Sequence, residues 1–255
     1  MNRFDISGKV VLVTGGTRGL GRAISLHLAS QGAIVFAGYF QNESAAEEFR
    51  RQSAEGSYCC STIKANLMTA TGIQALYDQV IGPRGRLDAL IYNSATGVHK
   101  SLEALTQRHL ATVWQVNVGA FFDLSQKFRP NMPAGSRIVA ISSEGAARAV
   151  DRYGAVGSSK AALEALCRQM AAEWTPSGIS VNLVSPGLLE TDTLAVMERA
   201  DERVASEIRH SPLGRLVRLD EVAHVVHFLC SQASEGIIGQ TLVVDGGKRI
   251  SGLAS

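Results

Sequence analysis

The chain has 255 residues, of which 45% are hydrophobic and only 19% are charged, and its formal net charge is +2. This length and composition can bury a large core, and they predict one α/β domain over residues 1–255. Lysine and arginine form no block, which argues against nucleic acid or an anionic membrane surface as a partner and favours a small neutral or anionic ligand.

Two further features bear on the cellular location. No apolar run approaches the roughly 20 residues that a membrane span requires, and the polar residues before Val10 lead us to expect no signal peptide. Cys59, Cys60, Cys167 and Cys230 lie in apolar runs without the paired spacing of a metal site, so we expect buried free thiols. Both features predict a cytoplasmic protein.

Seven short runs of apolar and β-branched residues alternate with longer amphipathic segments. Most of the runs are apolar throughout, which is typical of parallel strands that are buried on both faces of a sheet. We therefore predict a doubly wound α/β domain, with a seven-stranded parallel sheet and helices on both faces. The predicted strands cover residues 10–13, 33–37, 58–64, 89–92, 137–141, 179–183 and 241–244.

The segment from Leu188 to Arg215 interrupts this alternation. It is charged, has no strand-like run, and separates the sixth predicted strand from the helix before the last strand. Long connections in compact domains are often functional, so we interpret residues 188–215 as a small mobile lid over the substrate. A solvated surface hairpin of helices is the alternative.

A glycine-rich loop follows the first predicted strand and leads into a helix. It reads Thr14-Gly15-Gly16-Thr17-Arg18-Gly19-Leu20-Gly21. Gly15 permits a tight turn, Gly19 lets the backbone approach a pyrophosphate, and Gly21 allows the helix to pack closely on the strand. The strand and helix around the GxxxGxG spacing predict dinucleotide binding; a purely structural turn is the alternative.

The end of the second predicted strand distinguishes NAD from NADP, because an acid there would bind the 2′-hydroxyl of NAD and repel a 2′-phosphate. The chain reads Ala37-Gly38-Tyr39-Phe40-Gln41-Asn42. The first acid is Glu43, which we expect to open the next helix. Arg18 can instead make a charge-assisted contact with a 2′-phosphate, so we predict NADP(H); a solvated loop arginine is the alternative.

Further motifs follow the later strands in a fixed order. They are Asn93-Ser94-Ala95, Val116-Asn117-Val118, Ile141-Ser142-Ser143, Tyr153 with Lys160, Ser185-Pro186-Gly187 with Thr191, and Val244-Asp245-Gly246-Gly247. With the glycine loop, they resemble the short-chain dehydrogenase/reductase family over nearly the whole chain. The resemblance implies a Rossmann domain, redox chemistry with a nicotinamide cofactor, and a homotetramer formed through the helices around 106–129 and 158–174.

The spacing of the tyrosine departs from the common family pattern. Most members carry Tyr-x-x-x-Lys, whereas Val156 stands four residues before Lys160 and the tyrosine is Tyr153, three residues further upstream. Ser143 keeps its usual distance of seventeen residues from the lysine. This Tyr-x6-Lys spacing, joined to Lys64-Ala65-Asn66, Asn93-Ser94-Ala95 and Thr191-Asp192-Thr193-Leu194, resembles the NADPH-dependent enoyl-acyl-carrier-protein reductases.

The resemblance implies which residues form the site. Tyr153, Lys160 and Ser143 are the candidate catalytic residues. The candidate cofactor-binding residues are Gly15, Thr17, Arg18, Gly19, Leu20, Gly21, Asn42, Asn66, Leu67, Asn93, Ser94, Ala95, Lys160, Pro186, Gly187, Leu189 and Thr191. No metal is expected, because the six histidines have no ligand partners at metal-binding spacing.

Helical geometry suggests different tasks for the two central residues. Offsets of four and seven both return to nearly the same helical face, so Tyr153 and Lys160 can share one pocket. Seven residues rise roughly 10 Å, against roughly 6 Å for four, so we assign Lys160 to the nicotinamide ribose and Tyr153 to the substrate. Gly154 and Gly157 make a regular helix between them doubtful.

These assignments predict reduction of a trans-2-enoyl thioester, carried by coenzyme A or acyl carrier protein, in fatty-acid or related secondary metabolism. Negative charge would develop on the thioester oxygen, and Tyr153 would donate a hydrogen bond to it. Ser143 either contacts the substrate or caps the exit from the fifth strand. Asn117 is interpreted as a structural amide and Asn93 as support for the backbone.

Three alternatives remain open. The first is an NADPH-dependent ketoreductase that acts on a 3-oxoacyl thioester or another carbonyl compound. The second is a catalytically silent nucleotide-binding regulatory protein. In the third, the two central residues have no catalytic role: Tyr153 is a packing residue, and Lys160 is a lysine that extends to the surface.

Overall fold

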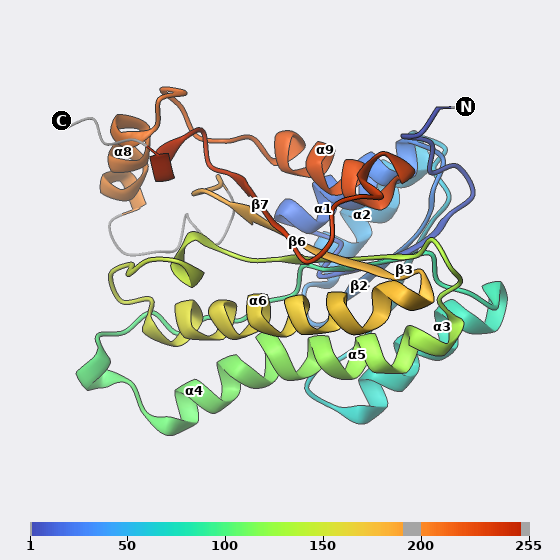
Figure 1. Ribbon diagram of the computed structural model, residues 1–255, viewed down its shortest axis with the longest axis horizontal. Helices are drawn as coiled ribbons and strands as arrows, with labels where there is room; N and C mark the ends of the chain where they lie inside the picture. The colour runs from blue at the N-terminus through green and yellow to red at the C-terminus, as the bar shows by residue number, and fades with distance from the viewer. Residues whose placement is uncertain (1, 191–199, 251–255) are drawn as a thin grey trace.

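The computed structural model describes residues 2–190 and 200–250. Seven parallel strands form one sheet in the order β3-β2-β1-β4-β5-β6-β7, which confirms the predicted doubly wound domain (Figure 1). The strands are β1 Val10–Thr14, β2 Ile34–Tyr39, β3 Cys60–Lys64, β4 Ala89–Tyr92, β5 Arg137–Ile141, β6 Ser180–Pro186 and β7 Thr241–Val244.

Helices cover both faces of the sheet (Figure 1). One layer contains α1 (Gly19–Ser30), α2 (Glu43–Glu55) and α9 (Leu219–Cys230). The other contains α3 (Ala70–Arg84), α4 (Gln107–Trp114), α5 (Ala120–Phe128) and α6 (Gly154–Trp174). The helix α8 (Ala200–His210) lies beside the turn that follows β7. Short 3-10 turns span Leu102–Ala104, Arg129–Asn131, Glu144–Ala146, Thr175–Ser177, Gln232–Ser234 and Lys248–Ile250.

Each continuous apolar strand contributes side chains to two hydrophobic cores, one on each face of the sheet. Successive side chains of a strand point to opposite faces, so Val11 and Val13 pack with Ile24 in the layer of α1 and α9. Leu12, between them, packs with Phe121 in the layer of α3, α5 and α6. All four aliphatic side chains named here are fully buried. This two-sided burial explains why the strand pattern was readable in the sequence.

The strand order reverses at β1, which has β2 on one side and β4 on the other. The chain leaves these neighbouring strands in opposite directions, so the loops at their carboxyl ends diverge and leave a crevice. The loops after β1, β4, β5 and β6 meet at this edge. The topology therefore assembles the motifs that the sequence presents separately.

Some local predictions were wrong. The helix α6 is continuous from Gly154 to Trp174, although the glycines argued against a regular helix. A Cβ atom on Gly157 would lie 2.7 Å from the Gly145 carbonyl oxygen, so close approach to the preceding turn requires glycine there. The sixth strand extends beyond the predicted end to Pro186.

The prediction of buried free thiols was correct for two of the four cysteines, wrong for Cys59 and only partly correct for Cys60. All four thiols are free, and Cys167 and Cys230 are buried. Cys59 is exposed and Cys60 is half-buried. Cys60 is the first residue of β3 and Cys59 precedes it; β3 is an edge strand of the sheet and buries few of its side chains. No helix among the described residues combines the length and the apolar character that crossing a bilayer requires.

Three histidines meet between α1 and α9. The Nε2 atom of His27 lies 3.1 Å from Nδ1 of His227, whose Nε2 lies 2.9 Å from the Phe4 carbonyl oxygen. The rings of His27 and His224 are 4.7 Å apart. Burial, together with the charges that His224 and His227 can carry, lowers the pKa of His27 to about 4. The folded protein therefore holds His27 neutral.

This cluster predicts a loss of stability in mild acid. Between pH 6.5 and about 4 the unfolded chain protonates His27 and the folded chain does not, so the free energy of unfolding falls as the pH is lowered through this window. We expect His27→Gln to reduce that fall when urea unfolding is compared at pH 7 and pH 5.

A matched control is His109→Gln on α4, which lies on the opposite face of the sheet. The control should keep the wild-type dependence on pH. An identical slope for the wild type and His27→Gln would contradict the assignment.

Candidate active site

A cavity of about 980 Å³ opens at the carboxyl ends of β1, β4, β5 and β6. It brings together the three candidate catalytic residues and all the described candidate cofactor-binding residues except Gly21. Thr191 lies outside the described residues. The wall also contains residues that the motifs did not indicate, including Tyr39, Phe40, Met68, Thr96, Gly97, Val150, Val156 and Leu188. Most of these residues come from loops, where no regular spacing marks them, whereas Tyr39 ends β2 and Val156 lies in α6.

The glycine loop is shaped by close backbone contacts. Gly15 and Gly19 have φ angles of +60° and +50°, which side chains rarely adopt. A Cβ atom on Gly21 would lie 1.9 Å from the Gly15 carbonyl oxygen and 2.6 Å from Nδ2 of Asn93. Gly21 therefore does not line the cavity itself. It allows α1 to begin close to the loop, so that the amino end of α1 lies at the cavity.

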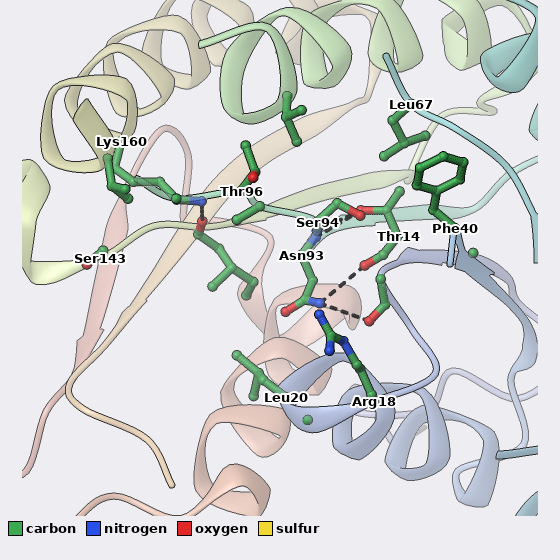
Figure 2. Close-up of a pocket in the computed structure, with 18 of the residues that line it drawn as sticks. Thr14, Arg18, Leu20, Phe40, Leu67, Asn93, Ser94, Thr96, Ser143 and Lys160 are labelled. Atoms are coloured by element: carbon green, nitrogen blue, oxygen red, sulfur yellow. Dashed lines mark hydrogen bonds between the residues drawn. The ribbon is translucent and has the colours of Figure 1, made fainter. Parts of the chain in front are cut away.

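Asn93 fastens the loop after β4 to the loop after β1 (Figure 2). Its Nδ2 donates to the carbonyl oxygens of Thr14, at 3.2 Å, and Gly15, at 3.1 Å. In return, Oγ1 of Thr14 accepts hydrogen bonds from the backbone N–H groups of Asn93 and Ser94. This network bears out the predicted backbone support and holds the cradle for a dinucleotide.

The far end of the cavity fits an NADP-type ribose. Asn42 caps α2, whose first residue is Glu43, as predicted. The Glu43 carboxylate accepts hydrogen bonds from Tyr39, Arg50 and Lys64, so its charge is already compensated. Arg18 lines the cavity from the glycine loop (Figure 2). A 2′-phosphate would thus meet a guanidinium and no uncompensated acid.

Lys160 is buried, with 4% of its surface exposed, which excludes the surface-lysine alternative. It projects from α6 and its ammonium donates to the Ile141 carbonyl oxygen at 2.7 Å. Burial lowers the pKa of Lys160 to about 8, because the charged form loses its hydration. At neutral pH the group remains mainly an ammonium with further donor capacity toward the cavity.

Tyr153 does not lie within the helix that carries Lys160. It is the residue immediately before α6, and Gly157 donates its N–H to the Tyr153 carbonyl at 2.7 Å. A Cβ atom on Gly145 would lie 2.5 Å from the Tyr153 ring, so the turn after β5 must carry glycine to admit this ring. Val156 therefore lines the cavity from α6 next to Lys160, in place of a tyrosine.

The Tyr153 hydroxyl meets a second hydroxyl. It lies 3.2 Å from Oγ of Ser143, and either atom can donate. Oγ of Ser143 also accepts from the Gly145 N–H at 3.4 Å, so Ser143 caps the turn as well as facing the cavity. The His99 ring is 5.5 Å from the Tyr153 ring. Two hydroxyls are thus available for one substrate oxygen.

Asn117 is a structural amide, as predicted. Its Oδ1 accepts from the Thr96 N–H at 2.9 Å, and its Nδ2 donates to the Thr96 carbonyl and to Oγ of Ser159. It lies in a single π turn, Gln115–Gly119, between α4 and α5. Within residues 2–190 and 200–250, no three His, Cys, Asp or Glu side chains are placed to hold a metal ion.

The glycine cradle allows a direct test of cofactor binding. We expect Gly21→Ala to weaken NADPH binding by about tenfold or more, because the new methyl group would displace the Gly15 carbonyl that shapes the loop. Calorimetric titration measures the effect. The control is Gly82→Ala on α3, where a Cβ atom meets nothing within 4 Å. Equal affinities for the two variants would overturn the assignment of the loop.

Proteins of similar sequence and structure identify the family of this chain. The sequence family described as enoyl-(acyl carrier protein) reductase matches residues 15–249. A 1-cyclohexenylcarbonyl-CoA reductase of Streptomyces collinus is 35% identical over 95% of this chain and 87% of its own length.

Two solved structures extend the comparison. A short-chain dehydrogenase of Burkholderia cenocepacia in complex with NADP is 31% identical with a TM-score of 0.89, over 96% of this chain and 99% of that one. LugOII, a promiscuous reductase that catalyses keto-reduction at C1 during lugdunomycin biosynthesis, is 33% identical with a TM-score of 0.88 over the same shares. The chain belongs to the short-chain dehydrogenase/reductase family.

Proposed function

We propose that this oxidoreductase uses NADPH to reduce the carbon–carbon double bond of a trans-2-enoyl thioester. The observation that carries the proposal is the position of Tyr153, outside α6 and three residues upstream of the common family position, while Lys160 stays in the helix. The Streptomyces collinus relative supports the same substrate class, because the name of its substrate describes a ring double bond next to a CoA thioester.

NADP(H) is the cofactor that the cavity fits, and when bound it supplies the hydride. Lys160 lines the cavity, and its ammonium donates to the Ile141 carbonyl; we propose that it also binds the hydroxyls of the nicotinamide ribose. The glycine loop and the start of α1 hold the pyrophosphate. Arg18 binds the 2′-phosphate.

The hydroxyl groups stabilise the charge that develops on the substrate. Reduction at the β-carbon moves the π electrons toward the thioester oxygen, which becomes an enolate oxygen. Tyr153 donates a hydrogen bond to that oxygen, and Ser143, 3.2 Å away, orients the tyrosine hydroxyl. The α-carbon then takes a proton, which completes a saturated thioester.

A ketoreductase is the second candidate, and one observation favours it. Ser143 and Tyr153 form a hydroxyl pair that can equally bind a carbonyl oxygen and protonate it after hydride addition. LugOII, with the same fold, performs a keto-reduction. The two reactions differ in whether hydride arrives at the carbon that bears the oxygen or at the carbon two bonds further along.

Partners and pathway belong to the proposal. The thioester is carried by coenzyme A or acyl carrier protein, in fatty-acid or related secondary metabolism. We propose a homotetramer, supported by exposed Leu110, Trp114 and Phe122 on α4 and α5. The cytoplasmic location remains a prediction.

The substrate class is tested with two thioesters. We expect purified protein to oxidise NADPH with crotonyl-CoA and to turn over acetoacetyl-CoA at least about tenfold more slowly in kcat/KM. Absorbance at the reduced nicotinamide band measures both rates. Oxidation of NADPH with acetoacetyl-CoA alone would replace the enoyl proposal with the ketoreductase. No turnover of either thioester, together with tight NADPH binding, would favour the regulatory alternative.

The role of the tyrosine is tested separately. Tyr153→Phe removes only the hydroxyl, so we expect kcat with crotonyl-CoA to fall by about 100-fold or more while the Kd for NADPH changes less than about twofold. Lys160→Met should instead weaken NADPH binding. Wild-type kcat in Tyr153→Phe would falsify the assignment of the enolate donor.

A further inference from the structure

The motif Val244-Asp245-Gly246-Gly247 has no part in the proposed reaction, yet the structure gives it a definite shape. Gly246 and Gly247 have φ angles of +66° and +86°. Asp245 accepts hydrogen bonds from the backbone N–H groups of Gly247, at 2.9 Å, and Arg249, at 3.0 Å. This turn folds the chain back after β7 and directs Lys248 toward the wall of the cavity.

Lys248 lies between two carboxylates from distant parts of the chain. Its ammonium is 3.1 Å from Glu144, the residue after Ser143, and it also pairs with Glu207 on α8. The side chains of Lys248, Glu144 and Glu207 are 13%, 17% and 5% exposed. These three residues form a largely buried ionic cluster, named here the Lys248 cluster. Glu144 also accepts hydrogen bonds from Arg148 at 3.1 Å and 2.6 Å.

The cluster is connected directly to the cavity wall. Oε1 of Glu207 accepts the N–H of Leu188 at 3.2 Å, and Leu188 lines the cavity together with Gly187 and Leu189. Glu144 also lines the cavity, beside Ser143. A single ammonium therefore joins α8 and the segment after β6 to the turn that carries the Ser143 hydroxyl.

The same turn also holds the end of α8. The Ser211 hydroxyl donates to the Gly246 carbonyl at 3.0 Å, and the Leu213 N–H donates to the same oxygen at 3.1 Å. These contacts are neutral and do not depend on Lys248. Loss of the ammonium alone would leave them in place. It would remove the cation that bridges Glu207 and Glu144 and leave the buried Glu207 charge without that partner, while Glu144 keeps its pair with Arg148.

We propose that Lys248 is a positioning residue for substrate binding: through Glu207 and Glu144 it holds α8 and the Leu188 segment against the Ser143 turn. This fixes the width of the substrate end of the cavity. The inference rests on the proposed reductase activity, but it does not depend on whether the double bond is carbon–carbon or carbon–oxygen.

Kinetics with NADPH and whichever of crotonyl-CoA and acetoacetyl-CoA the wild type reduces provide the first test. We expect Lys248→Met to raise KM for the thioester by about tenfold, with kcat and the Kd for NADPH changed less than about threefold. Lys248→Arg, which keeps the charge, should restore KM. The double variant Lys248→Met/Glu207→Gln, which also removes the buried charge that Lys248 compensated, should recover part of it.

The control for ion-pair removal in general is Arg51→Met, which breaks exposed pairs with Glu48 and Glu55 on α2. It should keep the wild-type KM. Should Lys248→Met fail to fold, Glu207→Gln alone takes its place, with the same expected rise in KM. An unchanged KM in a folded variant, or no recovery in Lys248→Arg, would overturn the proposal.

Hydrogen exchange gives a second readout that requires no turnover. In Lys248→Met, amides of residues 201–210 in α8 should exchange faster by about tenfold, while those of α2 stay as in the wild type. If the wild type reduces neither thioester, the proposed function fails and this exchange result alone decides the role of Lys248. Unchanged exchange in α8 would then exclude that role.

Discussion

The hydrogen bond from the Lys160 ammonium to the Ile141 carbonyl is the contact on which the rest of the site depends. It fastens α6 to the end of β5, where the Lys160 side chain is buried. Ser143 lies two residues beyond Ile141, and Tyr153 stands at the start of α6, so this one contact helps to set where their hydroxyls meet. Burying an ammonium is costly, and its lowered pKa reports that cost.

The displaced tyrosine leaves the functional groups of the site the same but changes which element presents each of them to the cavity. Val156 supplies an apolar surface in the helix next to Lys160, while Tyr153 reaches the cavity from the preceding turn. Gly145 and Gly157 make room for that arrangement at the level of the backbone. The seven-residue spacing from Tyr153 to Lys160 and the glycines at 145 and 157 therefore belong to the same local arrangement.

The sequence predicted the sheet and most of the cavity because both depend on local patterns. Buried parallel strands are continuous apolar runs, and the loop of Gly15 and Gly19 has a fixed spacing. It could not predict the Lys248 cluster, whose members lie 41 residues or more apart and meet only through the fold. It also misplaced Cys59, because the order of the strands, which puts β3 at an edge of the sheet, is not encoded in the local pattern of the chain.

The π turn at Gln115–Gly119 has a consequence for communication across the molecule. Its Asn117 grips both backbone groups of Thr96, so the loop that lines the cavity after β4 is attached to the helical rod of α4 and α5. The outer face of that rod carries Trp114 and Phe122 to solvent. The same helical unit therefore presents exposed aromatic side chains on its outer side and anchors a loop of the cavity wall on its inner side.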